Sequence, residues 1–274
     1  MKDSDIKILF TDLDDTLLNS DKEVSTTDLE SIDRMVKAGH KFVVATGRPF
    51  YSADKLCKKL GFIRPGFYLV CSNGGVLYDY DKQDFIKKTT VTSENISYVF
   101  DLARKAGLHI HTYTNDYVVS ERETEELIFY CDRIKMPYKI LDHIPEDLPY
   151  LPPKMVIMSS NGRSALIPFE KSLHPWIDGK MSTVFSSEYL LEVLPIEATK
   201  GNGVRTLCSH FNIPIENSIC CGDEENDISM IVAAGIGVAM KNGTDSVKAH
   251  ADYITCNTNN ENAITEVIEK FILS

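Results

Sequence analysis

The sequence predicts an α/β fold in which a parallel β-sheet, covered by helices on both faces, is split by an inserted α+β domain. Short, almost wholly apolar strands alternate with amphipathic helices near both ends of the chain, a pattern typical of parallel sheets that are buried on both faces. The middle of the chain instead has alternating strands, a hairpin signal and a proline-rich stretch. We therefore expect a core formed by 1–81 and 195–274 and an insert formed by 82–194.

The core elements are predicted from hydrophobic spacing and from the residues that end each run. The helices expected at 26–39 and 51–60 have apolar residues at helical spacing and end at or just before a glycine. In chain order, the expected core strands are 6–10, 41–45, 68–71, 218–221, 236–240 and 253–254. The remaining core helices are expected at 203–211, 228–234, 246–250 and 262–272.

The insert is predicted to mix helices with a β-hairpin. Two runs of alternating residues, 109–113 and 117–120, flank Thr114-Asn115-Asp116, which is typical of a hairpin turn. The other strands of the insert are expected at 155–159, 183–186 and 189–193, and its helices at 93–106, 123–134 and 163–174.

Composition excludes several classes of function. The 29 basic and 40 acidic residues give a net charge of −11, which disfavours binding to nucleic acid or to an anionic membrane. The longest nearly apolar run, 231–240, is far shorter than the ~20 residues of a membrane-spanning helix, and the N-terminus does not resemble a signal peptide. Seven scattered cysteines without a CxxC pair favour a reducing, cytoplasmic location and make a zinc site improbable.

Two carboxylates, Asp12 and Asp14, directly follow the first expected strand. Active sites of open parallel sheets lie at the carboxyl ends of strands, and a carboxylate there can coordinate Mg²⁺ and attack phosphorus. For these residues alone, a solvated acidic turn is an equally good interpretation.

A second polar cluster, Thr46-Gly47-Arg48, follows the strand at 41–45. A hydroxyl group beside an unshielded glycine amide suits a phosphate oxygen, although a plain turn is the simpler interpretation. Lys200 opens a helix, where a cation opposes the helix dipole, so it is expected to have an anionic partner unless it is a surface lysine.

The last cluster follows the strand at 218–221. Asp223 lies where a second metal carboxylate would be, Asn226 can donate to phosphate, and Asp227 can hold Lys200 in place. An acidic helix N-cap is the alternative, because carboxylates favour that position.

Taken in chain order, these clusters read Asp-x-Asp, Thr, Lys and Gly-Asp-x-x-Asn-Asp, and they resemble the motifs of the haloacid dehalogenase-like hydrolase superfamily. The long insert makes the chain similar to the Cof-type phosphatases of that superfamily, which have a Rossmann-like core and a C2-type cap. Ser72-Asn73-Gly74-Gly75 and the stretch from Gly237 to Asp252 also match this subfamily. The resemblance covers nearly the whole chain.

The resemblance implies a Mg²⁺-dependent phosphatase that hydrolyses small phosphorylated metabolites, such as sugar phosphates, through an aspartyl-phosphate. It implies that Asp12 is the nucleophile and that Asp14 is the general acid and base. The implied phosphate-binding residues are Thr46, Gly47, Lys200 and Asn226; the metal ligands are Asp12, the Asp14 backbone carbonyl and Asp223; the supporting residues are Asp227, Glu224 and Arg48.

Charge independently favours a metal ion. With Asp14 protonated, the other three aspartates and a phosphate dianion sum to −5, and Lys200 alone cannot neutralise them. A bound Mg²⁺ would shield the anionic nucleophile from its anionic substrate. The neighbouring carboxylates are expected to keep Asp14 protonated near pH 7.

Two other functions remain open from the sequence. A phosphomutase would use the same scaffold but return the phosphoryl group to the sugar. A non-enzymatic phospho-acceptor of the response-regulator type would also use Asp, Thr, Lys and Mg²⁺, although receivers place the acceptor and the acidic pair on different strands. A nucleotide-binding kinase is disfavoured, because GxxxxGK[ST] is absent and Gly235-Ile236-Gly237 lacks a third glycine.

Substrate specificity is expected to depend on the insert. Candidates are the hairpin residues His109, His111, Tyr113 and Tyr117 and the turn at 186–189, although aromatic residues at alternating strand positions more often pack in a core. We expect no nucleic-acid or membrane partner, and either a monomer or a homodimer.

Overall fold

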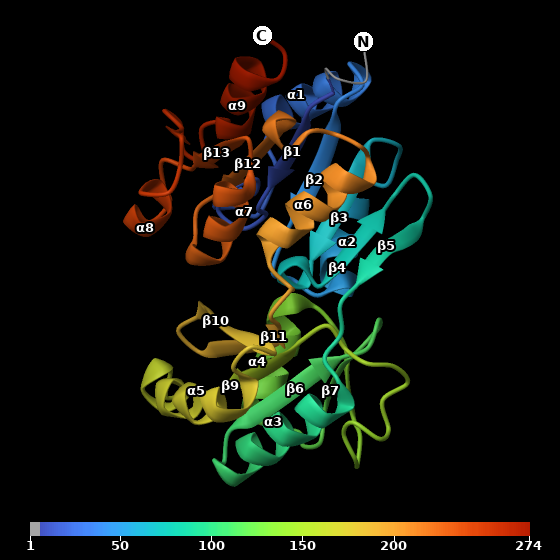
Figure 1. The fold of residues 1–274 in the computed structure, drawn as a ribbon, viewed down its shortest axis with the longest axis vertical. Helices are drawn as coiled ribbons and strands as arrows, with labels where there is room; N and C mark the ends of the chain where they lie inside the picture. The colour runs from blue at the N-terminus through green and yellow to red at the C-terminus, as the bar shows by residue number, and fades with distance from the viewer. Residues whose placement is uncertain (1–5) are drawn as a thin grey trace. The chain divides into compact units, whose positions relative to one another are not determined.

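The computed structural model describes residues 6–274 and divides the chain into two compact units (Figure 1). The first, the core unit, comprises residues up to Arg48, Ala53–Lys87 and Thr199–Ser274. The second, the cap unit, comprises Pro49–Ser52 and Lys88–Ala198. These junctions lie beside the expected insert of 82–194.

The core unit is built on an eight-stranded sheet in the order β14-β13-β12-β1-β2-β3-β4-β5. Every neighbouring pair from β14 to β3 is parallel, and β4 pairs with β3 antiparallel. This arrangement confirms the predicted α/β class, whereas β4 and β5 were not predicted. The core strands are β1 (Ile8–Thr11), β2 (Lys41–Ala45), β3 (Phe67–Cys71), β4 (Val76–Asp79), β5 (Asp84–Lys88), β12 (Ser218–Gly222), β13 (Ile236–Ala239) and β14 (Tyr253–Ile254).

Helices pack on this sheet through their apolar stripes. Val204 and Leu207 of α6 and Met230 of α7 join one buried cluster with strand residues such as Phe10 and Val43. Elsewhere, α1 is joined to α9 by the Asp28 carboxylate, which accepts hydrogen bonds from the backbone and hydroxyl of Thr265. The core helices are α1 (Thr26–Lys37), α2 (Phe50–Lys59), α6 (Lys200–His210), α7 (Ile228–Ala233), α8 (Asp245–Lys248) and α9 (Ala263–Phe271).

The cap unit has its own six-stranded sheet in the order β10-β11-β9-β6-β7-β8. The expected hairpin is present as the antiparallel pair β6 and β7. The cap strands are β6 (His109–Tyr113), β7 (Val118–Ser120), β8 (Tyr138–Ile140), β9 (Met155–Met158), β10 (Met181–Ser187) and β11 (Leu190–Pro195). Its helices are α3 (Ser93–Lys105), α4 (Glu125–Ile134) and α5 (Arg163–Ile177).

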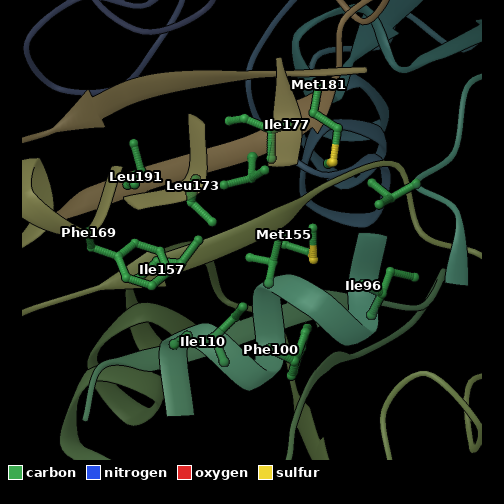
Figure 2. Packing of buried hydrophobic residues seen from close by; sticks show 14 of the residues in the cluster. Ile96, Phe100, Ile110, Met155, Ile157, Phe169, Leu173, Ile177, Met181 and Leu191 are labelled. Carbon is green, nitrogen blue, oxygen red and sulfur yellow. The ribbon is translucent and has the colours of Figure 1, made fainter. Parts of the chain in front are cut away.

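The main hydrophobic cluster of the cap lies between its sheet and helices α3 and α5 (Figure 2). Phe100 of α3 and Leu173 of α5 are buried against strand residues such as Ile110, Ile157 and Leu191. Burying a side chain of this size contributes about 1.5–3 kcal/mol, so this cluster gives the cap a core of its own.

The candidate specificity residues of the first cap strand are core residues instead. His109, His111 and Tyr113 are buried, and their side chains form a chain of contacts that continues from Tyr113 to Tyr130 of α4. Burial lowers the pKa of His109 to about 4, and it also lowers that of His111, so both rings are neutral. Packing, rather than substrate contact, explains these aromatic residues.

Among the described residues, no helix has both the length and the apolar character that crossing a membrane requires. The cysteines are present as thiols, without a disulfide bond.

Candidate functional site

Four neighbouring strands of the core sheet, β12, β1, β2 and β3, each end in one of the polar segments that the sequence singled out. The strands run parallel, so their carboxyl ends lie at one edge of the sheet. Lys200 begins α6, whose N-cap is Thr199. The edge therefore gathers side chains that are far apart in the sequence.

Lys200 connects two of the expected carboxylates. Its Nζ donates to Asp12 Oδ1 at 2.5 Å and to Asp227 Oδ1 at 2.6 Å, and the Lys200 and Asp227 side chains are fully buried. The second oxygen of Asp227 accepts hydrogen bonds from the backbone amides of Asp223 and Glu224. Asp227 therefore fixes both the lysine and the turn that carries Asp223. The anionic partner that Lys200 was expected to need is present.

Asp223 approaches the same cluster from β12. Its Oδ1 accepts a hydrogen bond of 2.6 Å from the Thr16 hydroxyl, which lies in the turn after Asp12. Carboxylate oxygens of Asp12, Asp223 and Asp227 lie within 4.8 Å of one another. Gly222 makes this approach possible, because a Cβ at that position would lie 2.4 Å from the Cβ of Asp227.

Burial and mutual repulsion perturb these groups. Burial raises the pKa of Asp12 well above its usual value, against the attraction of Lys200, and the charges of Asp227 and Asp223 raise it further. Burial also raises the pKa of Asp223, to about 7. Burial opposes the charge of Lys200, but its two carboxylate partners outweigh that effect and raise its pKa. Three carboxylates thus share one ammonium group.

The donor set fits a hard divalent cation. The described hydrogen bonds engage one oxygen each of Asp12 and Asp223, whereas those of Asp227 engage both of its oxygens. Asp12 and Asp223 are therefore the carboxylates that can turn an oxygen to a metal, whereas Asp227 is occupied with Lys200 and two backbone amides. Oxygen ligands of this kind suit Mg²⁺, whose charge would reverse the rise in both pKa values.

Asp14 differs from the expectation of a protonated acid. Arg48 holds its carboxylate through two hydrogen bonds, of 2.9 Å from Nε and 2.8 Å from Nη2. Partial burial acts to raise the pKa of Asp14, but the hydrogen bonds and charge of Arg48, together with Lys22, lower it overall. The expectation that Asp14 keeps its proton near pH 7 is wrong for this conformation, because Arg48 and Lys22 together outweigh the effect of burial on its pKa.

The expected phosphate-binding residues lie on three segments of this edge. Thr46 is buried after β2, and its Oγ1 accepts a hydrogen bond from the backbone amide of Arg48. Gly47 lies between them, against the side chain of Asn73, which follows β3. Asn226, in the 3₁₀ turn Glu225–Asp227, donates from Nδ2 to Asn73 Oδ1 at 3.3 Å.

Glu224, expected as a supporting residue, caps a helical turn. Its side chain accepts from the Asp227 backbone, while the Asp227 side chain accepts from the Glu224 backbone. Its side chain is exposed and does not belong to the cluster of Asp12, Asp223 and Asp227. The reciprocal cap ties Glu224 to Asp227.

Two residues at this edge received no role from the sequence. Thr16 lies two positions after the Asp-x-Asp motif, and Asn73 lies in the quoted segment Ser72-Asn73-Gly74-Gly75. A polar residue after a buried strand was the available signal in each case. Their partners, Asp223 and Asn226, are more than 150 positions away in the chain.

The family model that matches the chain, over residues 9–268, describes a haloacid dehalogenase-like hydrolase. The chain belongs to this family. A crystal structure of a haloacid dehalogenase-like hydrolase from Bacteroides thetaiotaomicron is similar to it, with 31% identity, a TM-score of 0.87, and coverage of 97% of this chain and 99% of that one. The resemblance seen in the sequence is therefore confirmed.

Curated relatives of this hydrolase carry the names of phosphatases. YxeH of Bacillus subtilis is 28% identical over 272 residues, with coverage of 98% of this chain and 99% of the relative. 5-Amino-6-(5-phospho-D-ribitylamino)uracil phosphatase YcsE, from the same organism, is 26% identical, with coverage of 99% and 98%. The expected enzyme class, a phosphatase, is thereby confirmed.

Proposed function

We propose that this hydrolase cleaves the phosphate monoesters of small metabolites with the help of Mg²⁺, through an aspartyl-phosphate formed on Asp12. The observation that carries the proposal is the buried group of Asp12, Asp223, Asp227 and Lys200, in which the carboxylates outnumber the ammonium by three to one. Such an imbalance fits a site that receives a further cation.

Asp12 is the group from which nucleophilic attack is expected. An Asp12 oxygen forms a bond to phosphorus while the bond between phosphorus and the leaving oxygen breaks. Lys200, which contacts Asp12, and donors from Thr46, Gly47 and Asn226 would stabilise the charge on the phosphoryl oxygens. Water then attacks phosphorus, the bond to Asp12 breaks, and inorganic phosphate leaves.

Asp14 supplies and removes the proton in these two steps. It gives a proton to the leaving oxygen and takes one from the attacking water. In the resting structure Asp14 is an anion paired with Arg48, so it must acquire a proton before the first step. A substrate dianion that draws Arg48 toward itself would weaken this pair and raise the pKa of Asp14.

Asp12 and Asp223 would hold Mg²⁺, with the backbone carbonyl of Asp14 as the third expected ligand. The bound ion would supply charge neutralisation to the phosphoryl oxygens and to the cluster itself. Apart from that contribution, the chain's own residues orient the nucleophile: Lys200 holds one Asp12 oxygen, and Asp227 holds Lys200.

Sugar-like phosphates are the substrate class that we propose. The relative YcsE acts, by its name, on a phosphorylated ribityl compound, which has a sugar-derived chain. The net charge of −11 agrees with a small substrate rather than a polyanion, because long-range repulsion would oppose nucleic acid.

The test is phosphate release from p-nitrophenyl phosphate and from a panel of phosphorylated metabolites, after metal removal and then with added Mg²⁺. Wild-type protein is expected to need Mg²⁺, and Asp12→Asn to have lost turnover. Asp15→Asn is the matched control, since Asp15 is an exposed aspartate whose left-handed backbone (φ of 60°) asparagine tolerates. Turnover by Asp12→Asn at the wild-type rate would refute the mechanism.

The same assay separates the two other functions. A phosphomutase would convert a sugar phosphate into its isomer faster than it releases phosphate. A phospho-acceptor without enzymatic turnover would hold acid-stable label on Asp12 for minutes. Either result would replace the proposed hydrolysis.

A further inference from the structure

Asn73 lies where two of the expected phosphate-binding segments meet. It is 3% exposed, in the 3₁₀ turn Ser72–Gly74 that follows β3. Its backbone amide donates to the Thr46 carbonyl at 3.1 Å, and its Oδ1 accepts from Asn226 Nδ2 at 3.3 Å. One buried residue therefore joins the segment after β2, through its backbone amide, to the segment after β12, through its side chain.

The turn that presents Asn73 has an unusual backbone. Ser72 and Asn73 are consecutive left-handed residues, with φ of 51° and 54°. The turn is held from two sides: the Ser72 amide donates to the Arg48 carbonyl at 2.9 Å, and a Cβ on Gly74 would lie 2.1 Å from the Thr199 carbonyl oxygen. Left-handed residues persist where their surroundings fix them, and they concentrate at functional sites.

Gly47 packs against the same Asn73 side chain. A Cβ added to Gly47 would lie 3.1 Å from Asn73 Oδ1, which is tighter than an ordinary van der Waals contact. Asn73 therefore occupies the space beside Gly47 that a side chain would need. The backbone of Gly47 and the Asn73 carboxamide therefore lie side by side.

The contact also fixes which way the Asn226 amide faces. Because Asn73 Oδ1 is an acceptor, it holds the NH₂ group of Asn226, rather than its carbonyl oxygen, toward the Asn73 side chain, which itself lies against Gly47. The NH₂ group has two protons, and the contact with Asn73 uses one of them. The second proton can then be donated to an anion.

We propose that Asn73 is a positioning residue for phosphate, which acts by orienting the Asn226 amide beside the bare backbone of Gly47. The inference rests on the proposed function. Without Asn73, Asn226 can rotate and present its carbonyl oxygen to the anion, which repels it. Loss of Asn73 should therefore weaken phosphate binding without removing any group that contacts phosphate.

A double-mutant cycle tests this role. Asn73→Gly keeps the left-handed backbone accessible and deletes the side chain, and Asn226→Ala deletes the donor. The measured quantities are the KM for p-nitrophenyl phosphate, the inhibition constant of inorganic phosphate, and the midpoint of thermal unfolding. Each single variant is expected to weaken phosphate inhibition by about tenfold, and the double variant by no more than Asn226→Ala alone.

The control is Asn212→Gly. Asn212 is also a left-handed asparagine (φ of 53°), but it is exposed after α6. It should leave both kinetic constants unchanged. Additive effects in the double variant, or a wild-type inhibition constant in Asn73→Gly, would overturn the inference, because a purely structural turn would act independently of Asn226.

If Asn73→Gly does not fold, Asn73→Asp is the variant in which phosphate inhibition is measured instead. Aspartate has the same shape and retains the acceptor for Asn226, but it places a negative charge beside the anion, so phosphate inhibition should weaken by about tenfold or more. An unchanged inhibition constant would contradict the placement of Asn73. Calorimetry separates this inference from the proposed function. It measures how strongly wild-type protein and the Asn73 variants bind inorganic phosphate, and this affinity can be compared even if the protein has no turnover.

Discussion

Each of the two units buries a lysine, and the two lysines are paired with different numbers of carboxylates. In the cap, Lys154 pairs with Glu192 at 2.8 Å, with side chains that are 1% and 6% exposed. In the core, Lys200 pairs with two carboxylates and has a third, Asp223, close by. In the cap one positive charge therefore pairs with one negative charge, whereas the core cluster has an excess of negative charge.

This difference supports the proposal that the core cluster is the reactive one. A paired buried ion can be replaced by well-packed apolar residues with little loss, so its presence says little about function. An unbalanced cluster keeps pKa values displaced, as for Asp12 and Asp223, until a cation or a substrate arrives. The neutral histidines of the cap agree with this division, because burial removed their charge.

The largest expected effect is that of Lys200→Met. It leaves two carboxylates buried without their partner, which should lower the free energy of unfolding by about 3–5 kcal/mol and abolish phosphate release. Lys154→Met is the matched variant in the cap, where Glu192 loses its ion pair with Lys154 and a similar loss of stability is expected. Urea unfolding at neutral pH measures both. If Lys200→Met released phosphate at close to the wild-type rate, the Lys200 cluster would not be the reactive one, and it would no longer differ in function from the Lys154–Glu192 pair of the cap.

Much of the fold could be predicted because the central strands are nearly continuous apolar runs. The strands that escaped prediction are short or polar: β4 has four residues, Val76–Asp79; β5 spans Asp84–Lys88 and is largely exposed; and β8 spans Tyr138–Ile140 within the proline-rich stretch. Their pairing depends on the neighbouring strand rather than on their own pattern. Helix α5 also continues to Ile177, beyond the expected end at residue 174, with Pro175 in its last turn.

At the site, spacing located the side chains but not their orientation. The position of Asp14 two residues after Asp12 is visible in the sequence, whereas its pairing with Arg48 depends on rotamers and reverses the expected protonation. The contact between Asn73 and Asn226 joins residues 153 positions apart and requires the folded sheet. The catalytic and ligand roles of the site residues stay predictions until variants are measured.

The second-largest expected effect is a dependence of the free energy of unfolding on pH in metal-free protein. The pKa of Asp223 is raised to about 7 from 3.8, so its contribution is fully present below pH 3.8 and is lost as pH rises toward 7. Stability should therefore fall over this interval, by a few kcal/mol at most. The buried histidines act in the opposite direction, because their pKa values are lowered.

Comparison with Asp223→Asn isolates this contribution. The variant lacks the titrating group and should lose less stability between pH 4 and 7, as measured by urea unfolding with chelator present. A wild-type slope in Asp223→Asn would mean that Asp223 does not have its pKa raised in the folded state.

A smaller gain is expected from Mg²⁺ itself. An ion that binds the folded core alone should stabilise it by about 2.7 kcal/mol at 100 times its dissociation constant. Thermal unfolding of wild-type protein with and without Mg²⁺ measures this shift. Asp223→Asn should lose most of it, while the cap variant Lys154→Met should keep it in full. An equal shift in Asp223→Asn would place the ion elsewhere.

The smallest expected effect concerns the pair of Arg48 and Asp14, which is more exposed than either buried network. The Asp14 side chain is 41% exposed and that of Arg48 30%, so solvent screens their attraction and Arg48→Leu should cost only about 0–1 kcal/mol at pH 7. Because Arg48 lowers the pKa of Asp14, the stabilisation is present above pH 3.8 and is lost as pH falls through the lowered pKa. Urea unfolding at pH 7 and pH 3 should therefore show a smaller acid-induced loss in Arg48→Leu than in wild type. A large loss of unfolding free energy in Arg48→Leu at pH 7 would mean that Arg48 stabilises the core through contacts other than Asp14. The expected contrast between the exposed Arg48–Asp14 pair and the buried Lys200 cluster would then not hold.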